Sequence, residues 1–322
     1  WDQKGKAALS VQGKGNVEIE LDGDNELKSG TQSAGLEKTS TGTLTLKDDN
    51  NEAGSLTATG GFNSAGIGGG YLGDGKNITI TGGTVNATGG SSGAGIGGGR
   101  DGKGENITIT GGTVNATGNE DGAGIGGGSS GSGENITING GEVTASGGDN
   151  WDDCGAGIGG GNGGVGKNIT ITGGEVKATG GANGAGIGGD GGSGGSNVTV
   201  SGAAQVTATA GKGSRYAGAG ATIGGGGSST QDSDGNTVPT PGTEIQADIK
   251  GLTTGYIHHI IYEQDGTTIK REWWEPVRPQ PNPEDPNAPT EESNEVDLGT
   301  PGLHVETLEG DPLPFDARQQ GS

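Results

Sequence analysis

Residues 77–97 read N-I-T-I-T-G-G-T-V-N-A-T-G-G-S-S-G-A-G-I-G, and this pattern returns along the middle of the chain. The string N-I-T-I begins at Asn77, Asn106, Asn135 and Asn168, and it returns as N-V-T-V at Asn197. The string G-I-G-G recurs around Ile67, Ile96, Ile125, Ile158 and Ile187. Both series advance by the same 29, 29, 33 and 29 residues, so they indicate a structural repeat rather than a chance enrichment in glycine.

Each repeat contains short stretches in which apolar and polar residues alternate, a pattern typical of β-strands. In the quoted repeat we expect Ile78 and Ile80 to face inward from one strand, Val85 and Ala87 from a second, and Ile96 from a third. No stretch has the apolar period of a helix. The sequence therefore predicts an all-β protein, a parallel β-helix (β-solenoid) with three short strands in each coil.

Composition supports a solenoid over an ordinary globular domain. Glycine supplies 79 of the 322 residues, and hydrophobic residues make up only 26%, against roughly 45–50% in typical domains. The segments N-V-E-I-E-L (16–21) and T-L-T-L (43–46) match the first strand of the repeat less regularly. Two irregular rungs and five closer to the consensus give about seven rungs, and no single coil could bury enough apolar surface to fold alone.

Four segments follow from these patterns. Residues 1–59 are predicted to form irregular N-terminal coils and a cap, and residues 60–227 the regular solenoid. Residues 228–275 are predicted to form a C-terminal β element, with a hairpin around the turn at 263–266 that either caps the solenoid or starts a neighbouring domain. Residues 276–322 read as an acidic, proline-rich linker and the start of a possible further module.

Charge and chain chemistry exclude several classes of partner. The net charge of −22 argues against nucleic acids and anionic membranes as partners, and no run approaches the roughly 18 apolar residues of a membrane span. The chain begins at Trp1 and contains no Met, so we expect a mature form or an excised fragment. The single cysteine, Cys154, excludes an intrachain disulfide, and we expect it to be a free thiol in an exposed loop.

The strings G-A-G-I-G-G-G and N-I-T-I-T-G-G-T-V-N-A-T-G-G resemble those of large repeat-bearing surface proteins of Gram-positive gut bacteria. Those proteins often carry β-helical modules described as carbohydrate-binding. The resemblance extends over roughly residues 10–227. It implies a right-handed parallel β-helix, secretion to the cell surface and a role in adhesion. Host or dietary glycans or a host surface protein are the implied partners. The matching residues are structural, so the resemblance names no ligand.

One loop departs from the repeat and is the first candidate binding site. The corner between the second and third strands grows by four residues in the coil of the 33-residue interval. It then reads Gly148, Asp149, Asn150, Trp151, Asp152, Asp153, Cys154. Stacked corners would bring Asp121, Arg215 and Tyr216 onto the same edge. An aromatic face beside carboxylates and amides suits a sugar ring, whereas a solvated loop with its Trp folded over the coil is the plain alternative.

The same loop offers hard oxygen ligands for calcium in Asp149, Asp152 and Asp153, although a solvated acidic loop explains them equally. The outward T-x-T pairs form a ladder like the ice-binding face of some solenoid antifreeze proteins, or simply a stable strand surface. No recurring acid and base constellation indicates catalysis. We therefore expect a non-catalytic structural or adhesive module. A spacer stalk, an ice-binding protein and a polysaccharide-degrading enzyme are the alternatives.

Overall fold

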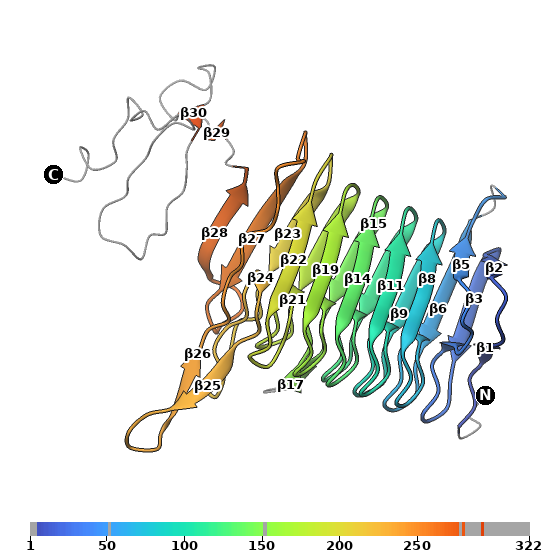
Figure 1. Cartoon of the computed structure of the whole chain (residues 1–322), viewed down its shortest axis with the longest axis horizontal. Helices are drawn as coiled ribbons and strands as arrows, with labels where there is room; N and C mark the ends of the chain where they lie inside the picture. Colours follow the sequence, from blue (N-terminus) through green and yellow to red (C-terminus); the bar gives the residue numbers. More distant parts are fainter. Residues whose placement is uncertain (1–4, 51–52, 151–152, 277–278, 281–290, 293–322) are drawn as a thin grey trace. The chain divides into compact units, whose positions relative to one another are not determined.

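A computed structural model describes residues 5–50, 53–150, 153–276, 279–280 and 291–292. The chain divides into two compact units, Trp1–Glu272 and Trp273–Ser322. The first unit is a parallel β-solenoid in which successive coils stack in chain order (Figure 1). Among the described residues, no helix has the length and apolarity that crossing a bilayer requires.

Three stacked sheets of eight, seven and nine strands form the solenoid, and each coil of the regular region contributes one strand to each sheet. Sheet A contains β1 (Leu9–Val11), β4 (Leu36–Lys38), β7 (Ile67–Gly68), β10 (Ile96–Gly97), β13 (Ile125–Gly126), β18 (Ile158–Gly159), β21 (Ile187–Gly188) and β24 (Ile223–Gly224). Sheet B contains β2 (Val17–Glu20), β5 (Leu44–Lys47), β8 (Gly75–Ile80), β11 (Gly104–Ile109), β14 (Gly133–Ile138), β19 (Gly166–Ile171) and β22 (Gly195–Val200). Sheet C contains β3 (Gly23–Lys28), β6 (Gly54–Thr59), β9 (Thr84–Thr88), β12 (Thr113–Thr117), β15 (Glu142–Ser146), β20 (Glu175–Thr179), β23 (Gln205–Thr209), β27 (Tyr256–Tyr262) and β28 (Ile269–Glu275).

Short antiparallel pairs lie outside the three sheets. They are β16 (Asp149–Asn150) with β17 (Asp153–Cys154), β25 (Ser228–Gln231) with β26 (Thr237–Thr240), and β29 (Pro279–Gln280) with β30 (Glu291–Glu292). The last pair belongs to the second unit. The predicted fold class is confirmed: the described chain is all-β, the sheets are parallel, and about seven coils stack.

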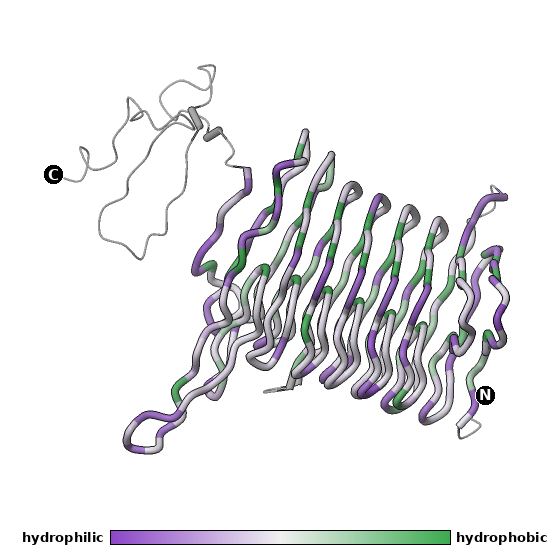
Figure 2. The backbone as a smooth tube through the Cα atoms, in the orientation of Figure 1, coloured by the Kyte–Doolittle hydropathy of each residue, from purple (hydrophilic) through white to green (hydrophobic). Residues whose placement is uncertain are grey.

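The core is a set of aliphatic columns that run the length of the solenoid. Ile78, Ile107 and Ile136 stand on one another in sheet B, and each is fully buried. Val85 and Ala87 of sheet C and Ile96 of sheet A face the same interior, as the alternation predicted. Figure 2 shows hydrophobic residues recurring at the same place in successive coils. Stacking therefore supplies both the hydrogen bonds and the apolar contacts that one coil lacks.

An asparagine ladder runs beside these columns on sheet B. The side chain of Asn106 donates through Nδ2 to Oδ1 of Asn77 at 3.1 Å, and Asn135 donates to Asn106 at 3.2 Å. Asn168 and Asn197 continue the ladder at 3.0 Å each. All five asparagines have φ between 54° and 56°, a left-handed conformation that asparagine tolerates better than most residues. The N-I-T and N-V-T triplets therefore have a structural role in holding coils in register.

The C-terminal β element continues the solenoid and covers its last coil. Strand β27 pairs in parallel with β23, so that Ile257 lies over Val206 and is fully buried. Isolated bridges from Thr199 to Asp248 and from Gly224 to Glu244 cover the ends of the other two sheets. The turn predicted at 263–266 joins β27 to β28. The exposed strand edges of the last coil are thus paired within the first unit.

Cys154 corrects one expectation from the sequence. Its side chain is fully buried and its sulfur forms no disulfide, so the prediction of a thiol in an exposed loop was wrong. The residue directly precedes the G-A-G-I string, as Asn63, Ser92 and Asn183 precede theirs, and those side chains are buried too. Cys154 therefore occupies a repeat position at the base of the enlarged loop, beneath Gly181 of the next coil.

Candidate functional site

The loops on either side of sheet A form one continuous edge of the solenoid. In each coil, one loop leads from sheet C to sheet A and a second leads from sheet A to sheet B; we call these loops together the loop edge. Backbone hydrogen bonds connect the two series across coils, from Arg100 N to Asn63 O at 2.9 Å and from Ser129 N to Ser92 O at 2.8 Å. In Figure 1 these loops stack along the lower side of the solenoid, opposite the turns between sheets B and C.

The loop edge gathers the exposed apolar side chains of the coils. Among the described residues from 30 to 227, the exposed large hydrophobic side chains are Phe62, Tyr71, Leu72, Val165 and Tyr216. All five lie in the loop edge rather than on the outer faces of sheets B and C. The outward positions of those two faces hold mainly threonine, asparagine and charged residues. The loop edge is therefore the chemically distinct surface of the solenoid.

Phe62 and Tyr71 meet around one residue of the preceding coil. The N–H of Gln32 donates to the carbonyl of Phe62, and the carbonyl of Gln32 accepts from the N–H of Tyr71, both at 3.1 Å. The two aromatic residues are 56% and 39% exposed. Leu72 follows them with 59% exposure. We call Phe62, Tyr71 and Leu72 the aromatic patch.

Leu72 occupies a backbone position where an apolar residue is unusual. Its φ is 58°, and the equivalent positions in the next three coils hold Asp101, Ser130 and Gly163 with φ of 58°, 60° and 71°. Left-handed backbone costs a residue such as leucine roughly 1 kcal/mol. The chain thus places a large exposed side chain where a small or polar one would fit more easily. Tyr71-Leu72 could have been found in the sequence as a departure from the repeat, but only after alignment of this loop.

The enlarged loop predicted as the centre of a glycan site forms a small hairpin at its base. Asp149 pairs with Cys154 and Asn150 with Asp153 across β16 and β17. Asp149 is exposed. Trp151, Asp152 and the side chains of Asn150 and Asp153 lie outside the described residues, so their roles stay predictions.

Asp121 lies in the coil next to this hairpin, where it hydrogen-bonds to residues of the neighbouring coils. Its carboxylate accepts a hydrogen bond from the Ser92 hydroxyl at 3.1 Å, and its carbonyl accepts from Asn162 N at 2.7 Å. A carboxylate engaged by the neighbouring coil is less available to a ligand. The structure therefore places Asp121 on the predicted edge while giving it a structural contact there.

Arg215 and Tyr216 project from the last loop of the same edge. The Arg215 guanidinium lies 4.2 Å from the centre of the Tyr216 ring, a cation–π contact. The Ser214 hydroxyl accepts hydrogen bonds from the backbone N–H groups of Tyr216 and Ala217 and fixes the loop. The loop of Ala182 and Asn183 separates them from the 149–154 hairpin, so they stand about two coil spacings, or about 10 Å, away.

The calcium prediction rests on the 149–154 hairpin and stays open. Within the described part of the chain, no three His, Cys, Asp or Glu side chains gather as a metal site would require. Asp149 is the one member of the predicted ligand set whose side chain is described, and Asp152 and the Asp153 side chain are not.

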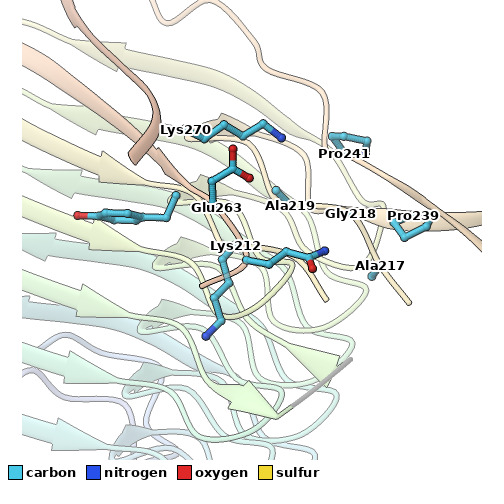
Figure 3. Close-up of a pocket in the computed structure, with 10 residues that line it drawn as sticks. Lys212, Ala217, Gly218, Ala219, Pro239, Pro241, Glu263 and Lys270 are labelled. Atoms are coloured by element: carbon cyan, nitrogen blue, oxygen red, sulfur yellow. The ribbon is translucent and has the colours of Figure 1, made fainter. Parts of the chain in front are cut away.

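A cavity of about 210 Å³ opens at the C-terminal end of the loop edge. Three segments build it: the loop that carries Arg215 and Tyr216, the end of β26, and the turn between β27 and β28. Its lining residues are Lys212, Ala217, Gly218, Ala219, Pro239, Pro241, Tyr262, Glu263, Gln264 and Lys270 (Figure 3). The sequence offered no signal for this cavity because its residues lie outside the repeat.

A buried polar network lies under the same cap. The Glu244 carboxylate accepts from the Thr222 N–H at 2.7 Å and from its hydroxyl at 2.8 Å, and the Thr222 hydroxyl also contacts Nδ1 of His259 at 2.7 Å. Burial raises the pKa of Glu244. Burial, together with the charges of His258 and Arg271, lowers the pKa of His259 to about 3. The carboxylate is bonded to the hydroxyl rather than to the imidazole, so the order differs from that of a nucleophilic triad.

The outward threonines of sheet B stand in register. Thr45, Thr79, Thr108, Thr137, Thr170 and Thr199 form one continuous column. Each is partly exposed. The T-x-T pairs noted in the sequence are thus an ordered array of hydroxyl groups at the spacing of stacked strands.

These features define a parallel β-solenoid with polar outer faces and one edge that carries exposed apolar side chains. Five segments of the chain match the family model described as a beta helix repeat: residues 52–71, 78–100, 107–129, 136–162 and 169–196. The matches fall on successive coils of the regular region, so the family model and the stacked parallel sheets agree on a β-helix repeat architecture there. Comparison with curated proteins and with solved structures gave no match.

Proposed function

We propose that this β-solenoid is a non-catalytic, extracellular adhesive module that binds glycans along its loop edge. The observation that carries the proposal is that, among the described residues from 30 to 227, every exposed large hydrophobic side chain lies in the loop edge. Sugar rings present an apolar C–H face that packs on aromatic rings, and hydroxyl groups that hydrogen-bond to amides and charged groups.

The aromatic patch supports glycan contact more directly than any other part of the edge. Phe62 and Tyr71 come from two loops that Gln32 joins by backbone hydrogen bonds, so both are held by the stacked coils. Arg100 follows in the next coil, and its side chain is half exposed. Two exposed rings, with a glutamine in the coil before them and an arginine in the coil after them, supply the residue types that stack on a sugar and donate hydrogen bonds to its hydroxyl groups. A rigid site of this kind loses little entropy on binding.

The proposal predicts that Phe62→Ala combined with Tyr71→Ala lowers glycan affinity about 10-fold or more. Each stacking contact contributes roughly 0.5–1.5 kcal/mol beyond area burial, and the two together account for that factor. A glycan array identifies binding oligosaccharides, and isothermal titration calorimetry then compares the variant with the natural chain.

Leu9→Ala is the matched control, because Leu9 is 40% exposed but lies in the first strand rather than in the loop edge. Trp151→Ala tests the hairpin separately, and unchanged binding in that variant would remove the hairpin from the site. Unchanged binding in the Phe62/Tyr71 variant would refute the aromatic patch. Release of new reducing ends from a bound glycan would contradict the non-catalytic role.

The register of the threonine column favours ice binding as a second candidate function. Ordered hydroxyl groups on a flat sheet can hold water in a regular arrangement, although threonine also suits the outside of a strand. If this function holds, the protein produces thermal hysteresis in a cooled solution, and Thr108→Lys combined with Thr137→Lys abolishes it. Hysteresis no greater than that of a control protein at equal concentration would exclude this candidate.

A further inference from the structure

We propose that the cavity at the C-terminal cap is a pocket for a single uncharged sugar unit, such as the terminal residue of a glycan chain. The inference rests on the proposed glycan-binding function and assigns it a second subsite with its own ligand chemistry. The cavity lies at the end of the loop edge, because the loop that carries Arg215 and Tyr216 also forms one of its walls.

The cavity combines an apolar wall with a polar rim. Ala217, Ala219, Pro239 and Pro241 supply the apolar wall, and Glu263, Gln264 and Lys270 supply the polar groups. A pyranose ring requires both, since its C–H face needs apolar contact and its hydroxyl groups need acceptors and donors together. Its volume of about 210 Å³ is below the roughly 300–1,000 Å³ of sites for larger ligands, so we infer one ring rather than a chain.

Two carboxylates on the turn between β27 and β28, those of Asp265 and Glu263, have different roles. Asp265 accepts hydrogen bonds from Thr267 N, Thr268 N and the Thr268 hydroxyl, which lower its pKa to about 2 and hold the turn closed. Glu263 makes no side-chain hydrogen bond or ion pair among the described residues, although its carboxylate lines the cavity. The turn thus needs Asp265 for its structure and leaves the Glu263 carboxylate available to accept hydroxyl groups.

The position of Glu263 is fixed before any ligand arrives. Its N–H donates to the Thr268 carbonyl at 2.8 Å, and its own carbonyl accepts from Gly266 N at 2.9 Å. On the opposite wall, Gly218 N donates to Ser228 O at 2.9 Å. Both walls are therefore held by backbone hydrogen bonds, which limits the ordering that a ligand must impose.

The charges at the cavity favour an uncharged ligand. Figure 3 shows Lys270 and Glu263 at the same side of the cavity, while the Lys212 ammonium is directed away from both. Lys212 instead extends along the turn at Gly266. One ammonium and one carboxylate then face the ligand, and their charges offset each other. An acidic sugar would meet the Glu263 carboxylate, whereas a neutral sugar can donate hydroxyl protons to Glu263 and accept from Lys270.

Saturation-transfer NMR and calorimetry test the proposal with four methyl glycosides: those of glucose, galactose, mannose and N-acetylglucosamine. Methyl galacturonoside serves as the acidic probe. We expect at least one neutral glycoside to bind, and Glu263→Gln or Lys270→Gln to weaken that binding 10-fold or more. Glu142→Gln is the matched control, since Glu142 is an exposed carboxylate on sheet C far from the cap. Equal melting temperatures would show that the variants remain folded.

The outcomes separate this inference from the proposed function. Unchanged neutral glycoside binding in both cavity variants would overturn the cavity proposal. The loop-edge function would stand in that case if Phe62→Ala with Tyr71→Ala still lowered oligosaccharide affinity. Tighter binding of the galacturonoside than of every neutral probe would overturn the assignment of an uncharged ligand. Binding of no saccharide by the full chain would overturn both proposals.

Discussion

Replacing Gly126 by alanine is expected to destabilise the solenoid by about 4 kcal/mol. Gly126 closes the two-residue strand of sheet A with φ of 138°, and an added Cβ would lie 1.9 Å from the carbonyl oxygen of Gly159 in the next coil. That oxygen accepts the hydrogen bond of Gly127 N at 2.9 Å. Overpacking of this kind costs roughly 1–3 kcal/mol, and a left-handed backbone with a side chain adds about 1–2 kcal/mol.

The substitution weakens the contact between neighbouring coils, and such contacts supply much of the stability of a repeat protein. We therefore expect the melting temperature of Gly126→Ala to fall by about 10 °C, as measured by circular dichroism. Gly194→Ala is the control, since its Cβ would meet nothing within 4 Å and its φ is not in the left-handed region. A change of less than about 1 kcal/mol is expected there. Equal melting temperatures for the two variants would contradict the close backbone approach in sheet A.

The repeating core could be predicted because its signal is periodic. Ile78, Ile107 and Ile136 recur at a fixed interval, and parallel stacking is the one arrangement in which each covers the next. The same reasoning located the loop edge, because an insertion that leaves the strands in register must emerge between them. The burial of Cys154 was also within reach, since aligning it with Ser92 and Asn183 places it at an inward position.

The cap and its cavity could not be predicted in the same way. Ile257 covers Val206, yet the segment around it shares no string with the repeat, so nothing in the sequence sets its register. The cavity depends on three segments far apart in the chain, among them Ala217, Pro239 and Glu263, and their meeting is a property of the tertiary structure. Structural features that arise from a contact repeated in every coil can be predicted from the sequence. Features that depend on single contacts between distant segments cannot.

The second large effect that we expect is a loss of stability in mild acid, caused by His259. Its folded pKa of about 3 lies below the ordinary value of 6.5, because it is buried beside Thr222 and near the charges of His258 and Arg271. The unfolded chain therefore binds a proton more readily between pH 6.5 and pH 3. The contribution of neutral His259 is fully present above pH 6.5 and declines as the pH falls through that window.

Protonation of His259 in the unfolded chain lowers the free energy of unfolding by roughly 1.4 kcal/mol for each pH unit below 6.5, which gives a loss of about 3 kcal/mol at pH 4. Glu244 acts in the opposite direction. Burial raises its pKa, so its protonation in acid favours the folded state and offsets part of the loss. Neutralising other carboxylates of a chain with net charge −22 also relieves repulsion in acid. The contribution of His259 must therefore be measured by comparing the pH dependence of stability between variants, because other groups also shape the pH profile of the natural chain.

His259→Gln isolates that difference, because glutamine can still hydrogen-bond to the Thr222 hydroxyl but does not titrate. Between pH 7 and pH 4 we expect the melting temperature of the natural chain to fall about 6–10 °C further than that of His259→Gln. His258→Gln removes the 2.6 Å contact with Glu272 and one of the smaller causes of the lowered pKa of His259, but it leaves the burial of His259, the largest cause, in place. Its melting temperature should therefore follow that of the natural chain more closely than that of His259→Gln does. If the melting temperatures of the natural chain and of His259→Gln fell equally with pH, this would show that the fold does not keep the His259 imidazole uncharged in mild acid. A difference confined to His259→Gln would show that the acid sensitivity arises from His259 in the cap.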